Sequence, residues 1–373
     1  MNVVVPKLGA VVMMAISLML ARCTGSVSSS ATATRTGTAI HITAQTQVRV
    51  TPTAVTGADG YLWMLGTYPC ATGTCPVLMR SADGGKSFAR VGTPPAGMYG
   101  IEFANRQDGY AYGPDYQGDS SRLYWTDDGG KFWRLVFARF QATVVITGGR
   151  AYVLVPENCS TKGLCKSLEV ASSLVTSDEW TMRPLPVTAV EAENQFGWTA
   201  FGSNVWLLLT WGVNRTRLLV SHDGGRTFSK LTPGGYLGAL GCSLTASSPT
   251  TLWGFCVTGN GGYAIRSTDG GRDFVNVGYP GGMSNAVQIF PISDTEAIFY
   301  PLFGDIWLTR SGGRRFNSLL RVPQNPQYTC QVALVGGTTW LVLGLSEETD
   351  EADLMWRTTD GGRSWQPVKA PRV

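Results

Sequence analysis

The chain repeats one short motif at a nearly constant spacing. A full copy has Ser or Thr two residues before an Asp, two glycines directly after the Asp, and an aromatic residue three positions beyond the second glycine. The five full copies are centred on Asp83, Asp128, Asp223, Asp269 and Asp360. Two worn copies lie among them: one keeps Asp178 without the glycines, and the other has Ser311 in place of the Asp. A fixed repeat of this length constrains the fold more strongly than any single motif does.

Successive copies are 45, 50, 45, 46, 42 and 49 residues apart, which is enough chain for four strands and their turns. Within a copy, the Asp carboxylate can accept N–H groups of its own turn, and the glycines allow positive φ. The segment 100–113 reads as strand, turn and strand, and no sustained helical periodicity is found in the chain after residue 22. These patterns predict an all-β fold: a seven-bladed β-propeller of four-stranded antiparallel blades over residues 43–373.

The motif resembles the Asp-box, or BNR, repeat of sialidases, sortilin-type receptors and some glycoside hydrolases. With the surrounding strands, as in Asp108-Gly-Tyr-Ala-Tyr-Gly113 and Arg357-Thr-Thr-Asp-Gly-Gly-Arg-Ser-Trp365, it is most similar to the Ycf48/Hcf136 group of photosystem II assembly factors and its bacterial relatives. That resemblance implies a scaffold or chaperone-like role. The Asp-box is specific for the fold and uninformative about activity, since one fold carries many functions.

The N-terminal residues have the pattern of an export signal. Residues 1–22 contain Lys7 followed by an apolar run from Leu8 to Ala21, which suits a signal peptide. The run ends before Cys23, the residue that a lipoprotein signal would acylate, although Arg22 departs from the small residue usual there. Residues 23–42 are rich in Ser and Thr and predict a flexible tether. We expect a lipoprotein at the outer face of the cell membrane, or a secreted protein.

The remaining cysteines fit an exported protein. Their spacing predicts three local disulfides and leaves Cys330 free in a core strand: Cys70–Cys75, Cys159–Cys165 and Cys242–Cys256. A metal site at the first two pairs is the competing interpretation, and their wide spacing and the presence of only two histidines argue against it. No cofactor is expected. The net charge of +4 is small and scattered, so nucleic acid is not an expected partner, and the chain is expected to be a monomer.

If the motif occupies the turn between the third and fourth strands of each blade, ligands should bind on the opposite face. An aromatic residue stands near the start of the inner strand in several blades, and these aromatics could ring the pore on that face: Tyr99, Phe196, Tyr236, Tyr279 and Tyr328. They either form a platform for a protein or glycan partner or cap the apolar inner strands. The loops of this face include 66–76, 156–167, which carries Lys162 and Lys166, and 344–353, which carries five acidic residues.

An enzyme is the alternative class. A glycosidase needs two facing carboxylates, and blade 2 offers Glu102, Asp115 and Asp119 without a spacing that singles them out. The Arg-Ile-Pro signature that sialidase-like propellers carry is absent from the sequence, so their catalytic residues cannot be transferred to it. The sequence therefore favours a non-catalytic binding or scaffold module, with a glycoside hydrolase or sialidase-like enzyme as the alternative.

Overall fold

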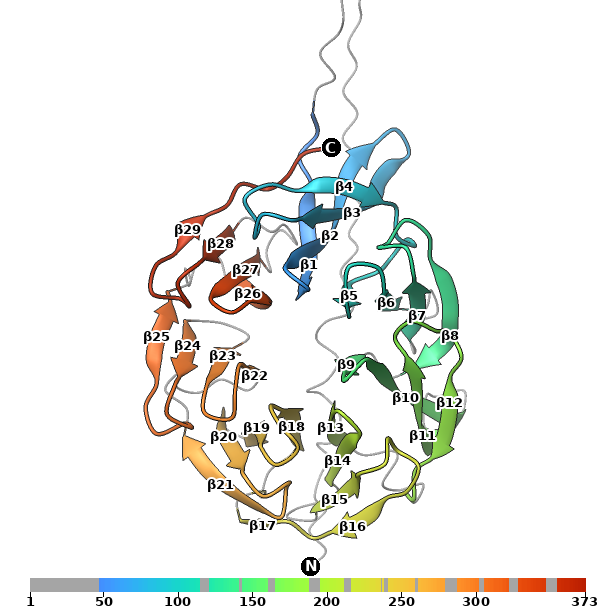
Figure 1. Ribbon diagram of the computed structural model, residues 1–373, viewed down its shortest axis with the longest axis vertical. Helices are drawn as coiled ribbons and strands as arrows, with labels where there is room; N and C mark the ends of the chain where they lie inside the picture. The colour runs from blue at the N-terminus through green and yellow to red at the C-terminus, as the bar shows by residue number, and fades with distance from the viewer. Residues whose placement is uncertain are drawn as a thin grey trace, which may run out of the picture. The chain divides into compact units, whose positions relative to one another are not determined.

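The computed structural model describes residues 47–114, 121–140, 143–159, 165–187, 195–210, 216–235, 237, 241–258, 261–278, 287–301, 305–321, 328–346 and 354–373. These residues belong to one compact unit, Gln47–Val373. Seven blades of four antiparallel strands follow one another around a central axis, and the first strand of each blade lies innermost (Figure 1). The predicted seven-bladed propeller is thereby confirmed.

The strands follow the chain order blade by blade. Blade 1 contains β1 (Thr51–Ala58), β2 (Tyr61–Cys70), β3 (Gly73–Ser81) and β4 (Ala89–Gly92). Blade 2 contains β5 (Gly100–Phe103), β6 (Gly109–Pro114), β7 (Ser121–Thr126) and β8 (Arg134–Phe140). Blade 3 contains β9 (Val145–Thr147), β10 (Arg150–Cys159), β11 (Cys165–Leu174) and β12 (Thr181–Pro184). Blade 4 contains β13 (Gln195–Phe201), β14 (Asn204–Thr210), β15 (Thr216–Ser221) and β16 (Ser229–Leu231).

The last three blades complete the ring. Blade 5 contains β18 (Gly241–Ala246), β19 (Leu252–Thr258), β20 (Gly261–Ser267) and β21 (Asp273–Gly278), with the two-residue β17 (Gly234–Gly235) added in parallel outside β21. Blade 6 contains β22 (Val287–Pro291), β23 (Ala297–Pro301), β24 (Ile306–Thr309) and β25 (Asn317–Leu320). Blade 7 contains β26 (Tyr328–Gly336), β27 (Thr339–Ser346), β28 (Leu354–Thr358) and β29 (Gln366–Pro367).

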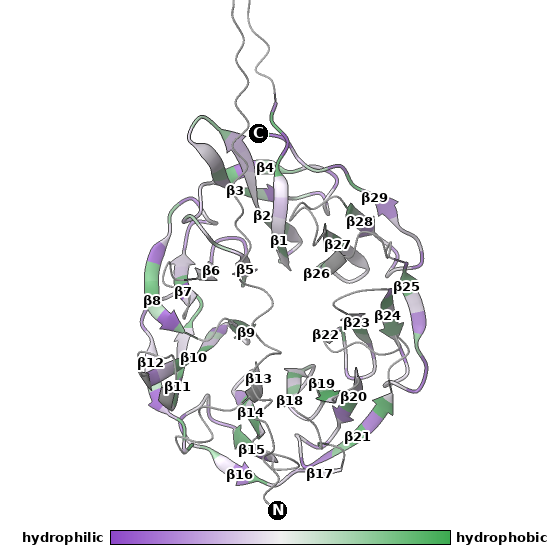
Figure 2. Cartoon of the chain, turned by 180° about the vertical axis from the view of Figure 1, so that it is seen from behind, coloured by the Kyte–Doolittle hydropathy of each residue, from purple (hydrophilic) through white to green (hydrophobic). Residues whose placement is uncertain are grey.

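The core lies between neighbouring blades. Second strands such as β14, with six consecutive buried residues, are apolar on both faces because each face packs against another sheet. The outermost strands, such as β4 and β16, are largely exposed. Seen from the opposite side in Figure 2, hydrophobic residues gather on the middle strands, such as β19, β23 and β24, and hydrophilic segments appear on the outer strands.

The repeated motif forms the turn between the third and fourth strands of a blade, as predicted. We call the residues from its Ser or Thr to its aromatic residue the box turn. In blade 1, Asp83 Oδ1 accepts the N–H groups of Lys86 (2.9 Å) and Ser87 (3.0 Å). The Ser81 hydroxyl donates to Asp83 (2.7 Å) and accepts the N–H of Gly85 (2.8 Å). The full copies in blades 2, 4 and 5 repeat this set of hydrogen bonds, so each Asp is held within its own turn.

The second glycine of a box turn also packs against the preceding blade. Gly130 has φ 95°, and a Cβ there would overlap the Leu78 side chain of blade 1. Gly271 has φ 92°, and a Cβ there would overlap Leu218 of blade 4. Glycine is thus required twice at this position, once by backbone conformation and once by the close approach of the neighbouring blade.

The two worn copies differ from each other. In blade 6, Gly312 and Gly313 keep positive φ, and Ser311 Oγ takes the place of the carboxylate by accepting the N–H of Arg315 (2.9 Å). In blade 3, the carboxylate of Asp178 makes no hydrogen bond in its own turn among the described residues and instead faces Arg134 of blade 2 at 3.6 Å. The worn copy of blade 6 therefore keeps the turn geometry, and that of blade 3 loses it.

Both end blades are complete, so the ring closes without exchanging a strand. Val48 and Val373 exchange two backbone hydrogen bonds of 2.9 Å, and the Val50 N–H donates to the Pro371 carbonyl (2.9 Å). Ahead of β1, the chain pairs with the C-terminal residues only through this short bridge, in which Arg49 lies opposite Arg372; residues 40–46 lie outside the described residues.

Side chains also hold together the junction between blades 7 and 1, which we call the seam. A bulge in β1 frees backbone groups at Thr53 and Val55, and the amide of Gln331 on β26 bonds both, each at 3.2 Å. The Arg357 guanidinium donates to the Gly84 carbonyl in the box turn of blade 1. A shared apolar cluster that includes Met64 of blade 1 and Leu341 of blade 7 lies beneath these contacts.

Two predicted loops are shorter than expected. β2 continues to Cys70 and β3 begins at Gly73, so most of the predicted loop 66–76 is hairpin strand. β10 and β11 likewise extend into the predicted loop 156–167. Strand pairing continues outward here because backbone groups bond to each other more favourably in a ladder than they would as an irregular loop.

No helix long and apolar enough to cross a membrane occurs among the described residues.

Candidate functional site

The inner strand β5 carries a carboxylate that lies at the junction of blades 1 and 2. Glu102 lies on β5 and accepts a hydrogen bond from the buried Thr56 hydroxyl of blade 1 at 3.0 Å. No other hydrogen bond to this carboxylate is found among the described residues. Burial raises the pKa of Glu102 to about 7, and the single bond from Thr56 offsets only part of that cost. Burial therefore favours the protonated form of the Glu102 carboxyl.

Two tyrosines of blade 2 stand beside Glu102. The Tyr112 ring on β6 covers Gly100, where a Cβ would overlap the ring. Tyr99 packs edge-on against Tyr112, with ring centroids 5.7 Å apart, and its hydroxyl lies 3.1 Å from Ser121 Oγ. Tyr99 is 42% exposed, although burial of its hydroxyl raises its pKa. It can therefore offer part of its ring to a ligand, while its hydroxyl is engaged with Ser121.

A third tyrosine approaches from the other side of the central axis. Tyr300, on β23 of blade 6, is buried and donates a hydrogen bond to Gln288 Oε1 on β22 (2.9 Å). Burial raises the pKa values of Tyr300 and Tyr112, and the nearby Glu102 carboxylate raises both further. Groups from blades 2 and 6 are thus within electrostatic range of one another across the ring. We call these five residues the pore cluster: Tyr99, Glu102, Tyr112, Gln288 and Tyr300.

Of the predicted pore-mouth aromatics, Tyr99 is found in the pore cluster. Phe196 and Tyr328 lie in strands β13 and β26, but their side chains are outside the described residues. Tyr236 and Tyr279 lie entirely outside them. So do Asp115, Asp119, Lys162 and the acidic segment 347–353, as well as Cys23 and the rest of residues 1–46; of Lys166 only the backbone is described. The ring of five aromatics therefore stays a prediction.

The cysteines lie as the sequence predicts where their side chains are described. Cys70 is bonded to Cys75, and Cys242 is bonded to Cys256 across the paired strands β18 and β19. The backbones of Cys159 and Cys165 are direct partners at the end of the β10–β11 hairpin, and their side chains are outside the description. Cys330 is free and buried, and burial raises the pKa of its thiol to about 12, so the thiol is protonated and inert.

Sequence reasoning missed three residues of the pore cluster: Tyr112, Gln288 and Tyr300. One signal was present for Tyr112, since Gly100 in an inner strand marks a position where a neighbouring ring needs room. Gln288 and Tyr300 belong to another blade, and no local pattern links them to Glu102. Within the described ranges, no three His, Cys, Asp or Glu side chains gather where a metal ion could bind.

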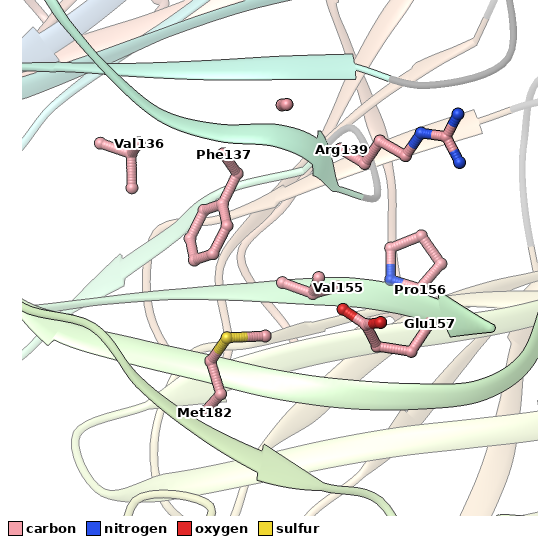
Figure 3. Close-up of a pocket in the computed structure, with 8 residues that line it drawn as sticks. Val136, Phe137, Arg139, Val155, Pro156, Glu157 and Met182 are labelled. Atoms are coloured by element: carbon pink, nitrogen blue, oxygen red, sulfur yellow. The ribbon is translucent and has the colours of Figure 1, made fainter. Parts of the chain in front are cut away.

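A separate open groove of about 420 Å³ lies between blades 2 and 3 at the outside of the ring. Its lining comes from β8, β10 and β12, with Phe137 and Met182 on either side of Val155 (Figure 3). Figure 3 shows Arg139 directed away from the groove. The Phe137 ring already packs against Trp180 at 5.2 Å. Because few polar groups converge on it, this groove is a weaker candidate than the pore cluster.

No protein-family model matches the chain. No curated protein matches it. Several solved structures of other proteins match it. The β-propeller domain of the Trilobed protease from Pyrococcus furiosus, described as having an open velcro topology, matches with a TM-score of 0.58 at 5% identity, covering 86% of this chain and 95% of that one. A puromycin-hydrolyzing peptidase from Mycobacterium tuberculosis matches with a TM-score of 0.55 at 15% identity, covering 87% of this chain and 53% of that one.

YCF48 from Cyanidioschyzon merolae is also similar, with a TM-score of 0.47 at 14% identity over 72% of this chain and 84% of that one. At such identities these likenesses concern the fold alone, and a propeller fold is shared by proteins of unrelated activity.

Proposed function

We propose that this protein is an exported propeller, anchored at the outer face of the cell membrane through Cys23, that binds a partner protein at the pore cluster without transforming it. The pore cluster is the observation that carries the proposal. It combines an exposed tyrosine ring, Tyr99, with the amide of Gln288 and the protonatable carboxyl of Glu102. Aromatic rings beside neutral hydrogen-bonding groups are typical of recognition surfaces.

A scaffold or assembly role is the form of binding that the motif resemblance to the Ycf48/Hcf136 group supports. A rigid ring suits that role because inter-blade packing holds the pore cluster in place before the partner arrives, which lowers the entropic cost of binding. Anchoring through Cys23 and the tether over residues 23–42 would keep the ring near membrane partners. Replacement of Cys23 by Ala should release the protein from the membrane fraction, which fractionation and immunoblotting would measure.

Affinity capture from the native membrane tests the binding proposal. The full chain and its Tyr99→Ala variant are compared with Phe132→Ala, which removes a 77% exposed aromatic ring from a box turn. A partner bound at the pore cluster should be recovered equally by the wild type and Phe132→Ala, and about tenfold less by Tyr99→Ala. Equal recovery by all three proteins would refute the pore cluster as the binding site. A glycan array run in parallel identifies a sugar partner instead.

One observation favours a second function. A carboxyl group with a pKa of about 7, as in Glu102, suits the general acid of a glycoside hydrolase. Hydrolysis of an extracellular glycan by the wild type, abolished in Glu102→Gln, would establish the enzyme in place of the binding module.

A further inference from the structure

A polar pocket of about 260 Å³ lies on the box-turn face, between blades 3 and 4. Blade 3 contributes Arg150 and Tyr152 from β10, Ser172 from β11, and Thr181 and Arg183 from β12. Blade 4 contributes Ser203 from its first turn, and Asp223, Gly224 and Arg226 from its box turn. The pocket shares no residue with the pore cluster, so it is independent of the proposed function.

The charges of this pocket are unbalanced. Three guanidinium groups face one carboxylate, that of Asp223, and no ion pair to Arg150, Arg183 or Arg226 is found among the described residues. The Asp223 oxygens are engaged in the box turn: Oδ1 accepts the N–H groups of Arg226 (3.0 Å) and Thr227 (2.9 Å), and Oδ2 accepts the Thr227 hydroxyl (2.7 Å). The carboxylate therefore cancels one of the three positive charges, and its own turn takes up most of its capacity to accept hydrogen bonds.

At other blade junctions, arginine side chains join neighbouring blades by donating hydrogen bonds to backbone carbonyls. Arg266 donates to the Asp294 carbonyl of blade 6 at 2.7 Å, and Arg310 donates to the Gly361 carbonyl of blade 7 at 2.8 Å. At the junction of blades 3 and 4, the Tyr152 hydroxyl does this by donating to the Gly202 carbonyl (3.0 Å). Arg150 supports this bond through its hydrogen bond to Tyr152, whereas Arg183 and Arg226 make no contact across the junction among the described hydrogen bonds and ion pairs.

The local contacts of these arginines leave donors unused. Arg150 reaches Ser172 Oγ at 3.5 Å, and Arg183 donates to the neighbouring Met182 carbonyl at 3.0 Å. A guanidinium group has five N–H donors, so most of them remain available in both residues. The Thr181 hydroxyl adds a neutral donor at the same space, whereas the Ser203 hydroxyl donates to the His222 carbonyl (3.1 Å). Arginine forks with hydroxyl groups are the donor set that binds tetrahedral oxyanions.

The size of the pocket limits its occupant, because pockets for drug-sized ligands are typically about 300–1,000 Å³. We propose that the pocket between blades 3 and 4 binds a phosphate or sulfate group, free or as the ester of a small molecule, through Arg150, Arg183 and Arg226. A planar carboxylate would use the three separated guanidinium groups less completely than a tetrahedral anion with three or four acceptor oxygens.

Titration calorimetry with inorganic phosphate and with sulfate at low ionic strength tests the proposal on the full chain. Arg226→Gln and Arg183→Gln change exposed side chains, so both variants should keep the wild-type unfolding temperature. Each should weaken phosphate or sulfate binding about tenfold or more. The matched control is Arg363→Gln, the same box-turn position in blade 7, which should leave the affinity unchanged within about twofold.

Three results would overturn the proposal: no binding of phosphate or sulfate by the wild type, equal loss in Arg363→Gln, or acetate binding as tightly as phosphate. Glucose 6-phosphate and glucose 6-sulfate then identify the source of the anion. Tighter binding of an ester than of the inorganic ion assigns the pocket to a small phosphorylated or sulfated molecule, and equal binding assigns it to the free ion.

Discussion

The fold shifts the pKa values of two carboxylates of blade 2 in opposite directions. The pKa of Asp128 in the box turn is lowered, and that of Glu102 in the pore cluster is raised. Burial alone would raise the pKa of Asp128, but N–H groups of Phe132 and Lys131 and the Thr126 hydroxyl bind its carboxylate and hold that pKa below its usual range. Glu102 receives one hydrogen bond, and burial raises its pKa to about 7.

The difference separates a structural carboxylate from an available one. A carboxylate that already accepts three hydrogen bonds within its own turn has less left for a ligand, so the repeated Asp of the box turn is a structural residue. A carboxylate that is buried and sparsely bonded still lacks partners that a ligand could supply. The four predictions below test one side of this comparison or the other, from the largest expected effect to the smallest.

The largest effect is expected at the box-turn glycine that packs against the preceding blade. Gly130→Ala should lower the free energy of unfolding by about 3 kcal/mol, since the methyl group overlaps Leu78 and the backbone has φ 95°. The control is Gly60→Ala, at φ 79° with open space around it, which should cost about 1 kcal/mol. Urea denaturation measures both. Equal losses would mean that contact with the preceding blade contributes nothing.

Glu102→Gln should change the pH dependence of stability. The folded-state pKa of about 7 is above the ordinary value of 4.5, so the unfolded chain loses its proton first as pH rises. Wild-type stability from this group is complete below about pH 4.5, falls as pH rises from there to about 7, and is constant at higher pH. The variant cannot ionise there, so it should be about 2 kcal/mol more stable than the wild type at pH 8 and equal to it at pH 4.

Urea denaturation across this pH range, with the exposed Glu179→Gln as control, gives the measurement. A constant difference between Glu102→Gln and the wild type at every pH would show that Glu102 is as well solvated as a surface carboxylate.

Asp128→Ala should destabilise the protein by about 1–2 kcal/mol at pH 7, because three donors lose their acceptor. The pKa of Asp128 is lowered, so its contribution is present above the ordinary carboxyl pKa and disappears as pH falls through the folded-state value. The difference between variant and wild type should therefore shrink in acid. Asp178→Ala, in the worn turn of blade 3, removes only an exposed ion pair and should cost less than about 0.5 kcal/mol.

The smallest effect is expected from repairing the worn turn of blade 6. Ser311→Asp should add about 0.5 kcal/mol, since a carboxylate accepts hydrogen bonds more strongly than the hydroxyl that now binds the Arg315 N–H. The reverse change in a full copy, Asp269→Ser, should lower stability by a similar or larger amount. A scan of thermal unfolding compares the two, and a loss of stability in Ser311→Asp would show that the turn geometry of blade 6 differs from that of the full copies.

The fold could be predicted from the sequence because its decisive contacts are local. Each box turn is closed by bonds within eight residues, such as those of Ser81, Asp83 and Ser87, so the motif reveals both the blade count and the face on which the turns lie. The pore cluster could be predicted only in part. Tyr99 and Glu102 were both visible in blade 2, whereas Tyr300 comes from a blade almost 200 residues later, and only closure of the ring brings it near.

The same reasoning explains the errors of detail. The carboxylate of Asp178 leaves its own turn because the glycines that shape the full copies are missing there, and Arg134 of the neighbouring blade is within reach. Gln331, which joins blades 7 and 1, belongs to no sequence motif. Its partners are backbone groups of Val55 and Thr53, which lie 276 and 278 residues away, so no local pattern could reveal the contact.

Because neither end blade borrows a strand from the other, the seam between Val48–Val50 and Pro371–Val373 is a place where the gene could be cut and rejoined elsewhere. A circular permutant that links residue 373 to residue 47 and opens at another blade junction would keep every four-stranded blade intact. The seam is also where mechanical load would enter. A pull on residue 47 against a partner held at the pore would peel the short backbone bridge from blade 7 before it strained any complete sheet, so the ring should open at this seam first under tension.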